Sequence, residues 1–277
     1  MKKIFLFVLF LLMFVIVGCG TEELNFGKKL VKVDGMVDIL VELDSKNSDV
    51  GVMDSIMAGY YINQQYKDKL MIVPDLTLAD EEYGIATRKD GAYTAKKISA
   101  TIIELSKSGK VLEIANKYGL KDSLAIDEST SIDLSDETGK EDFDEIIASG
   151  EMVIGYTIFA PIAYEENNKL IGFDIELAEA VCAELGIKAT FQLIDWDSKI
   201  FELNAGSIDV IWNGMTITDK IKEGASVTIP YLKNKQVAVI RVADKDLYKT
   251  TADMKDAVIC VEGGSAGQLC VEKEKSI

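Results

Sequence analysis

Two polar segments combine groups that can bind an anion, and each precedes an expected helix. The first follows a buried apolar run, lies ahead of a helix expected to begin near Thr218, and consists of Asn213, Gly214, Met215 and Thr216. The second is Gly263-Gly264-Ser265. Backbone N–H groups at a helix N-terminus, together with the helix dipole, favour a carboxylate or a similar anion. Glycine permits close approach of the backbone, and the Thr216 hydroxyl can donate a further hydrogen bond.

The chain contains no histidine. This removes the usual general base, most catalytic triads and the commonest zinc ligand. An enzyme would have to use Glu165, Glu166 or Glu262 as its acid or base, and none of these stands in a recognisable catalytic constellation. No catalytic residue, metal ligand or cofactor is therefore predicted.

Length and charge narrow the class of protein further. The chain has 277 residues, 48% of them hydrophobic and 27% charged, which is typical of a globular protein with one large or two modest domains. Its formal net charge of −16 argues against nucleic acid and against an anionic membrane surface as main partners.

The N-terminus has the pattern of a targeting segment. Lys2 and Lys3 precede an apolar run from Ile4 to Gly18, which is short for a membrane span. The run ends in Ile16-Val17-Gly18-Cys19, which resembles the lipobox of bacterial lipoproteins. The resemblance implies a signal peptide over residues 1–18, lipidation at Cys19 and a tether over 19–23. An uncleaved membrane anchor with an incidental cysteine is the alternative.

Three further cysteines lie in the body of the chain. Cys182 shares an apolar helical face with Ala178, Val181 and Leu185 and is interpreted as a core residue. Cys260 and Cys270 either pair in an oxidising compartment or remain buried free thiols.

Short β-rich runs alternate with helical patterns, which predicts an α/β fold with largely parallel sheets. Strands are expected at 31–33, 50–53, 83–87, 152–155, 189–193 and 237–242. Helices are expected at 37–43, 95–105, 111–118, 143–148 and 173–185. Residues 126–140 are acidic and rich in Ser and Thr, and are predicted to be an exposed linker.

Two stretches of the chain form a short internal repeat. Leu43 to Val50 matches Leu203 to Val210 in spacing, and in both a helix end and a polar turn lead through Asp-Val into an apolar strand. Two lobes built on the same plan would produce such a match, and chance is the alternative for so short a segment.

The stretch from Val153 to Ile240 closely resembles the bacterial extracellular solute-binding proteins of family 3, which bind polar amino acids for ABC transporters. The resemblance is carried by four motifs, namely 155–161 (GYTIFAP), 169–178 (KLIGFDIELA), 209–218 (DVIWNGMTIT) and Pro230-Tyr231. Further matches lie at 256–267, 49–54, 83–86 and 108–111. The resemblance implies the periplasmic-binding-protein type II fold, with two α/β lobes joined by a hinge of two chain crossings.

The order of these motifs differs from the family's order, because the segment 141–277 stands first in the family and about 25–125 stands last. The chain is therefore interpreted as a circular permutant, with residues 126–140 joining the family's usual termini. One lobe is expected from 81–125 plus 141–242, and the other from 24–80 plus 243–277. The alternative is a segment of a tandem array whose halves pair with other chains.

The resemblance also implies a ligand site between the lobes. Phe159 and Trp196 match aromatic walls against the ligand, with a role in the core as the alternative. Asp54 matches an acidic residue that pairs with the ligand's α-ammonium group, with a helix N-cap as the alternative.

The chain departs from the family at the position of the arginine that clamps the ligand carboxylate, which is Ile221 here. The two arginines, Arg88 and Arg241, lie outside the ligand motifs, and Lys220 is expected to point to another face of the helix. Either Thr216 and backbone donors recognise the carboxylate, or the ligand is not a simple α-amino acid.

The resemblance implies an extracytoplasmic lipoprotein, lipid-anchored in the cell membrane, that delivers a small polar solute, an amino acid being favoured, to an ABC permease. It is not expected to be an enzyme or to bind nucleic acid. The alternatives are a dehydratase-like enzyme on the same fold and a surface adhesin or sensor in which solute binding is secondary.

Overall fold

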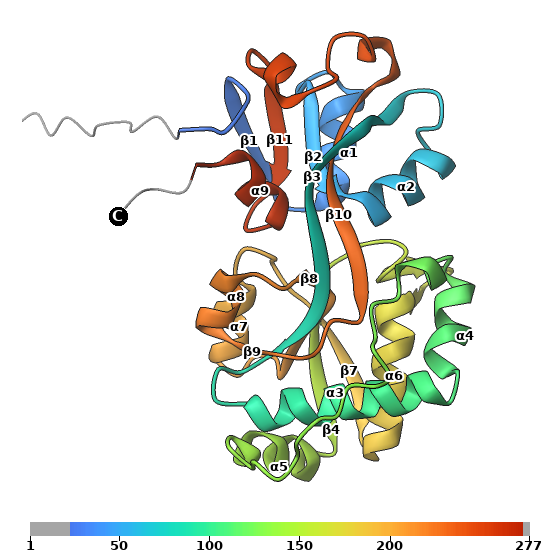
Figure 1. The fold of residues 1–277 in the computed structure, drawn as a ribbon, viewed down its shortest axis with the longest axis vertical. Helices are drawn as coiled ribbons and strands as arrows, with labels where there is room; N and C mark the ends of the chain where they lie inside the picture. Colours follow the sequence, from blue (N-terminus) through green and yellow to red (C-terminus); the bar gives the residue numbers. More distant parts are fainter. Residues whose placement is uncertain (1–22, 274–277) are drawn as a thin grey trace, which may run out of the picture.

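Two lobes lie one above the other along the long axis of the molecule, and long strands run from one to the other (Figure 1). The computed structural model describes residues 23–273. The predicted signal peptide and the lipidation site Cys19 lie outside these residues.

The upper lobe combines residues from both ends of the described chain. Its elements are β1 (Lys29–Val33), α1 (Met36–Asp44), β2 (Val50–Asp54), α2 (Ser55–Gln64), the short helices η2 (Val242–Asp244) and η3 (Thr251–Met254), β11 (Val258–Glu262) and α9 (Ala266–Val271). Strands β1, β11 and β2 are parallel neighbours. Their buried side chains form a core that includes Val50, Val52 and Ile259.

The lower lobe is formed by the middle of the chain. Its elements are α3 (Ala92–Lys107), α4 (Lys110–Lys117), η1 (Lys121–Ser123), α5 (Lys140–Ser149), β4 (Glu151–Tyr156), β5 (Tyr164–Glu166), β6 (Lys169–Ile171), α6 (Phe173–Leu185), β7 (Lys188–Leu193), α7 (Lys199–Asn204), β8 (Val210–Thr216), α8 (Asp219–Gly224) and β9 (Ser226–Val227). Strand β4 lies between its parallel neighbours β7 and β8, and β5 forms a separate hairpin with β6.

Strands β3 (Leu70–Thr87) and β10 (Leu232–Arg241) pair antiparallel and join the lobes. The strand order is β1-β11-β2-β10-β3-β8-β4-β7, so one sheet extends through both lobes. The strand predicted only at 83–87 is therefore the end of a much longer one. Residues Gln236 to Ile240 already pair with β2, so the second crossing lies before residue 236, and the predicted lobe boundary was 242.

The sequence signal for β3 is interrupted by Pro74, which cannot donate a hydrogen bond to a neighbouring strand. The register shifts there, because Ile72 pairs with Val239 and Thr77 with Val237. The extra residues form a bulge, and Asp75 adopts a positive φ of 59°. A β-bulge bends its strand and increases its twist, so β3 bends within the upper lobe.

Several element boundaries agree with the sequence patterns. Helix α6 spans the predicted 173–185 and ends at Gly186, whose φ of 74° favours glycine. Helix α5 likewise ends at Gly150 with a φ of 77°. Helix α2 was not predicted, because only Met57 and Ala58 are buried on it and its apolar pattern is weak.

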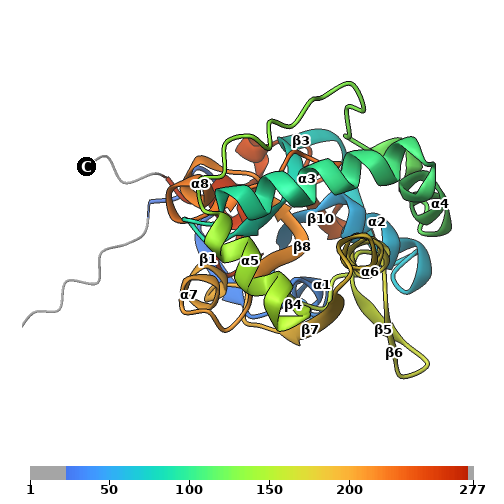
Figure 2. The same ribbon diagram turned by 90° about the horizontal axis from the view of Figure 1, so that it is seen from below.

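Of the acidic segment 126–140, residues 126–139 form neither a helix nor a strand and run alongside α3, and Lys140 begins α5 (Figure 2). Lys96 of α3 forms an ion pair of 2.6 Å with Asp136, and Ser106 donates a hydrogen bond of 2.7 Å to Glu128. The Lys96 ammonium group and the Thr138 hydroxyl lower the pKa of Asp136 to about 2. Specific contacts therefore hold this segment against the lower lobe.

The short internal repeat, 43–50 and 203–210, makes equivalent contacts in the two lobes. Asp49, before β2, accepts a hydrogen bond from the Val258 amide at 3.0 Å, and Asp209, before β8, accepts one from the Val153 amide at 2.7 Å. Each aspartate also pairs with an arginine at the end of a crossing strand, Asp49 with Arg241 at 3.2 Å and Asp209 with Arg88 at 3.0 Å.

Each arginine also donates to a backbone carbonyl just before the strand, Arg241 to Ser48 at 2.6 Å and Arg88 to Ile208 at 3.0 Å. The two arginines thus fix the crossing strands to the parallel strands in the same way, which supports one plan for both lobes. Between residues 23 and 273, none of the helices is long and apolar enough to cross a membrane.

We expect Arg88→Met to destabilise the protein by about 3–5 kcal/mol, because it leaves Asp142 and Asp209 without their cation. Arg241→Met should cost less, since its partner Asp49 has a more exposed side chain, 35% against 8% for Asp142. Urea unfolding measures both, with the exposed Lys121→Met as the control. A loss below about 1 kcal/mol for Arg88→Met would contradict this role.

Candidate functional site

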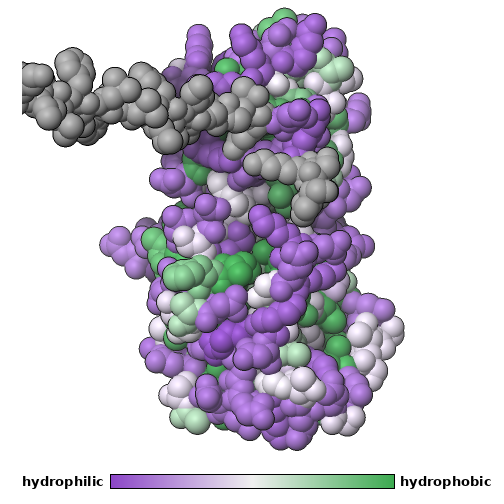
Figure 3. All heavy atoms as spheres, turned by 90° about the vertical axis from the view of Figure 1, so that its left-hand side faces the viewer, coloured by the Kyte–Doolittle hydropathy of each residue, from purple (hydrophilic) through white to green (hydrophobic). Residues whose placement is uncertain are grey.

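A cavity of about 490 Å³ lies between the lobes. All nine residues predicted for the ligand site line it, namely Asp54, Phe159, Trp196, Asn213, Gly214, Met215, Thr216, Gly264 and Ser265. The side of the molecule that carries α7, α8 and α9 is mostly hydrophilic, with hydrophobic side chains gathered at mid-height (Figure 3). The cavity is lined by both polar and apolar side chains, and these come from both lobes.

Strand β8 supplies the lower wall, and Gly214 is central to it. Its φ is +58°, and a Cβ atom there would lie 2.6 Å from the Phe159 ring. The Gly214 amide donates to the buried carboxylate of Asp174 at 2.7 Å, and the Ile217 amide donates to the Glu82 carbonyl at 2.9 Å. The Gly214 N–H of the predicted anion site and the neighbouring Ile217 N–H are thus already used within the protein.

Asp174 therefore fixes the position of the end of β8 through its hydrogen bond from the Gly214 amide. It lies on α6 and also accepts a hydrogen bond of 2.8 Å from the buried Tyr231 hydroxyl. Burial raises the pKa of Asp174 to about 7. Its role was not identified from the sequence, although it lies within one of the motifs that carry the family resemblance.

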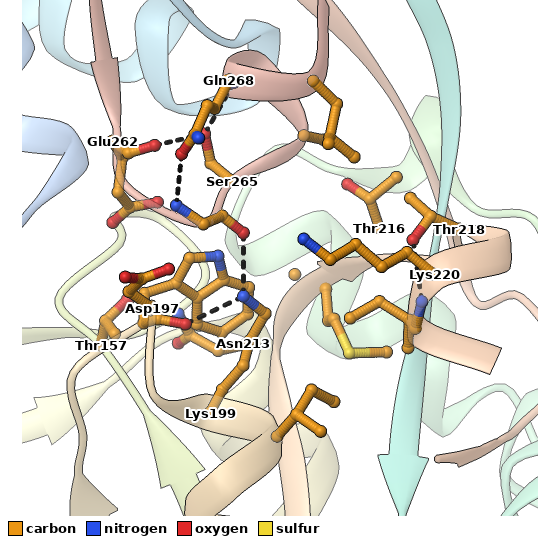
Figure 4. Close-up of a pocket in the computed structure, with 18 of the residues that line it drawn as sticks. Thr157, Asp197, Lys199, Asn213, Thr216, Thr218, Lys220, Glu262, Ser265 and Gln268 are labelled. Atoms are coloured by element: carbon orange, nitrogen blue, oxygen red, sulfur yellow. Dashed lines mark hydrogen bonds between the residues drawn. The ribbon is translucent and has the colours of Figure 1, made fainter. Parts of the chain in front are cut away.

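Hydroxyl and amide groups complete the lower wall. The Asn213 side-chain amide contacts Thr157, with 2.7 Å between the amide and the hydroxyl. Thr218 caps α8, where a helix was expected to begin, since its hydroxyl accepts a hydrogen bond of 3.1 Å from the Ile221 amide. Thr157, Asn213 and Thr216 are shown together in Figure 4.

The aromatic residues serve both as walls and as core. Phe159 is 4% exposed and meets Tyr83 edge-on, with 6.4 Å between ring centroids. Trp196 is 8% exposed and packs with the apolar cluster of the lower lobe. Each ring therefore presents only a small part of its surface to the cavity. The two interpretations of these residues, as ligand walls and as core residues, are compatible.

The upper wall is the turn before α9. Gly264 has a φ of +68°, and a Cβ atom there would lie 2.6 Å from Asp197 of the lower lobe. Its amide donates to the Gln268 side chain at 2.8 Å. Ser265 caps the helix, accepting from the Gln268 amide at 3.2 Å. Here too, the protein itself uses the amide that was predicted to bind an anion.

Lys199 connects the two lobes across the cavity (Figure 4). Its ammonium group donates hydrogen bonds of 2.9 Å to the carbonyls of Trp196 in the lower lobe and Gly264 in the upper lobe. It also lies 4.5 Å from the Trp196 ring centroid. Burial lowers the pKa of Lys199 to about 8 and raises the pKa of nearby Glu262 to about 8.

The prediction for Lys220 was wrong. Lys220 lines the cavity, and its side chain extends into it from α8 (Figure 4). The helix has only six residues, so a side chain near its start can still turn toward the opening. Ile221 lines the same wall and is 8% exposed. Arg88 and Arg241 instead form ion pairs with Asp209 and Asp49 within the lobes.

Several site residues were not predicted. Lys199, Asp197, Thr157 and Gln268 line the cavity, and their spacing in the sequence carries no distinctive signal. Glu262, considered as an acid or base, lines the cavity, whereas Glu165 and Glu166 lie on the exposed hairpin strand β5.

The thiols and metal-binding groups have no evident role in this site. Cys182, Cys260 and Cys270 are free, so the interpretation of the last two as unpaired thiols agrees with the structure. Within the described residues, no cluster of three or more acidic or cysteine side chains is arranged to hold a metal ion.

Residues 152–273 match the family of bacterial extracellular solute-binding proteins, family 3. This confirms the predicted resemblance for that segment. The ABC transporter arginine-binding protein 1 of Escherichia coli is 37% identical over 108 residues, which are 39% of this chain and 43% of that protein. The probable amino-acid-binding protein YxeM of Bacillus subtilis is 34% identical over 105 residues, covering 38% and 39% respectively.

Among solved structures, a polar amino acid ABC uptake transporter substrate-binding protein from Streptococcus thermophilus is 43% identical. The match covers 30% of this chain and 32% of that chain, with a TM-score of 0.29. The chain therefore spans less than half the length of each of these relatives. The α/β fold with two lobes is confirmed, and the named sequence relatives are binding proteins.

We expect Asp174→Asn to remove a pH dependence of stability. Since the folded pKa is raised from 3.8 to about 7, Asp174 favours folding at pH 4 and loses that contribution as the pH rises through 7. The wild type should lose on the order of 3 kcal/mol relative to Asp174→Asn between pH 4 and pH 8. Urea unfolding at both pH values measures the difference, and parallel curves for the two proteins would contradict it.

Proposed function

We propose that the protein is a solute-binding lipoprotein that encloses a small polar solute, an amino acid being favoured, between its lobes and delivers it to an ABC permease. The observation that carries this proposal is the cavity itself. It lies between two lobes joined by β3 and β10, and it is lined by carboxylate, amide, hydroxyl and aromatic groups from both lobes. Such clefts bind ligands by closure around a hinge.

Circular permutation of a self-contained chain is part of the proposal. The family match begins at residue 152, yet residues 23–125 contribute α1, β2 and α2 to the upper lobe and α3 and α4 to the lower lobe. The segment that precedes the match thus completes both lobes within one continuous sheet. This supports the permutant over a segment of a tandem array, whose halves would need partners from other chains.

The groups that would hold the solute follow from the site. Asp54 is the carboxylate at the end of β2 suited to a cationic nitrogen, and Phe159 and Trp196 offer apolar contact. Thr216 and the extended side chain of Lys220 are the donors available to an anionic end, in place of the arginine that Ile221 replaces. Binding without chemical conversion is proposed.

Amino acids and polyamines should be tested by thermal shift of the purified protein. A ligand that binds only the folded state stabilises it by about 2.7 kcal/mol at a concentration 100-fold above Kd, so a binder should raise the melting temperature selectively. Asp54→Asn and Trp196→Ala should abolish the shift, and the exposed Asp219→Asn should retain it. A shift that persists in Asp54→Asn would contradict the site, and a melt unaffected by every compound would contradict the amino-acid assignment.

Lipidation at Cys19 is proposed on the sequence pattern alone. We expect the protein to incorporate a labelled fatty acid in a bacterial host and to sediment with membranes. Cys19→Ser should abolish the label and release the protein, while Cys270→Ser should leave both unchanged. Label that persists in Cys19→Ser would refute the lipidation site.

A further inference from the structure

Two carboxyl groups are buried close together where β2 meets the crossing strands. Asp54 is 4% exposed and accepts a hydrogen bond of 2.5 Å from the Tyr83 hydroxyl. Glu81 is 8% exposed and accepts from the Gln236 amide at 3.1 Å. The Asn234 amide nitrogen bridges the pair, since it contacts Asp54 and lies 2.9 Å from Glu81.

Lysines lie nearby, Lys220 in the cavity that Asp54 lines and Lys233 and Lys235 beside Glu81, but none of them is paired with these two carboxyl groups in residues 23–273. Among residues 23–273, neither carboxyl group takes part in an ion pair. The side chains around Asp54 and Glu81 come from five elements: Tyr83 of β3, Asn234 and Gln236 of β10, Thr216 of β8, Glu262 of β11 and Cys270 of α9. The buried cation Lys199 acts on Glu262 and donates to backbone carbonyls.

Two adjacent buried carboxylates without a paired cation cannot both remain ionised at low cost, so the pair takes up a proton. Burial, followed by the charge of Glu81, raises the pKa of Asp54 well above its usual value, and burial raises the pKa of Glu81 as well. Asp54 is the more buried of the two carboxyl groups, and the charge of Glu81 adds to the effect of burial, which favours the shared proton on Asp54.

The two members of the pair face different spaces. Asp54 lines the cavity between the lobes, whereas Glu81 lines a separate hollow beside the crossing strands, next to Lys233 and Lys235. A cationic group in the cavity can therefore reach Asp54 directly and influence Glu81 only through it.

We propose that Asp54 and Glu81 form a proton-exchanging pair that holds one proton before the ligand binds and releases it when a ligand ammonium or guanidinium group binds at Asp54. This rests on the proposed function and specifies the ligand class as compounds with a cationic nitrogen. The O–H bond of the Asp54 carboxyl breaks, its proton passes to the solvent, and the ligand cation pairs with the carboxylate that remains. Net charge in the buried site is conserved by this exchange.

The exchange makes affinity depend on pH. Below the pKa of the pair, each unit of rising pH should increase the affinity for a permanently cationic ligand about tenfold, because one proton is displaced per ligand bound. Above that pKa the affinity should no longer change through this pair.

Isothermal titration calorimetry with L-arginine tests the release at pH 6 in two buffers of different ionisation enthalpy. The wild type should release close to one proton per ligand, so the apparent enthalpies should differ by that amount times the difference in buffer enthalpy. Glu81→Gln should release fewer protons than the wild type, because the charge of Glu81 no longer raises the pKa of Asp54, while its burial and the charge of Glu262 still do. Glu82→Gln, the exposed neighbour on the same strand, should behave as the wild type. Enthalpies independent of buffer in the wild type would overturn the proposal.

Infrared spectroscopy of the protein without ligand tests the shared proton separately. The difference spectrum between wild type and Asp54→Asn at pH 6 should contain a carboxylic-acid carbonyl band, and the contribution from Asp174, which is not among the groups around the pair, cancels in that difference. Its absence would overturn the proposal even if Glu81→Gln failed to fold. If the band is present and L-arginine does not bind at any pH, the failure lies with the proposed cationic ligand and not with the proton on the pair.

Discussion

The antiparallel pairing of β3 with β10 is the interaction on which the rest of the structure depends. These strands occupy the centre of the strand order, with β2 beside β10 in the upper lobe and β8 beside β3 in the lower lobe. The chain crosses between the lobes on these two strands, so their positions determine how the ends of β2 and β8 face each other. A connection of two strands with a bulge in β3 can bend while each lobe keeps its own hydrogen bonds.

The cavity follows from this arrangement. In α/β sheets, ligand sites lie beyond the carboxyl ends of the strands. Here Asp54 ends β2 and Thr216 ends β8, and the crossing strands bring the two ends to opposite sides of one space. The arginine contacts repeated in the lobes, at Asp49 and at Asp209, fix the starts of the same two strands. The polar ends can therefore be presented without disturbing the strand interiors.

The parts of this arrangement that depend on local sequence patterns could be predicted from the sequence. The apolar period and terminal glycine of α6 determined its limits, and the polar ends of buried strands indicated the residues that line the cavity. Signals that depend on tertiary contact were not readable. The length of β3 was hidden by Pro74, and Lys199 reaches its carbonyl partners only because two lobes distant in the chain meet there. The direction of Lys220 was predicted wrongly because the short helix α8 does not fix it by periodicity alone.

The lobes lie close together, but the contacts between them at the cavity contribute little free energy. The reason lies in the burial of the Lys199 ammonium group. Its two carbonyl partners do not compensate for the removal of the ammonium group from water, since its pKa is lowered to about 8. A buried cation of this kind contributes little to holding two surfaces together. The approach of Gly264 to Asp197 is steric and supplies no strong attraction. Under the proposed function, a solute that contacts both walls would supply the attraction that these two contacts lack, and closure would then depend on occupancy of the cavity.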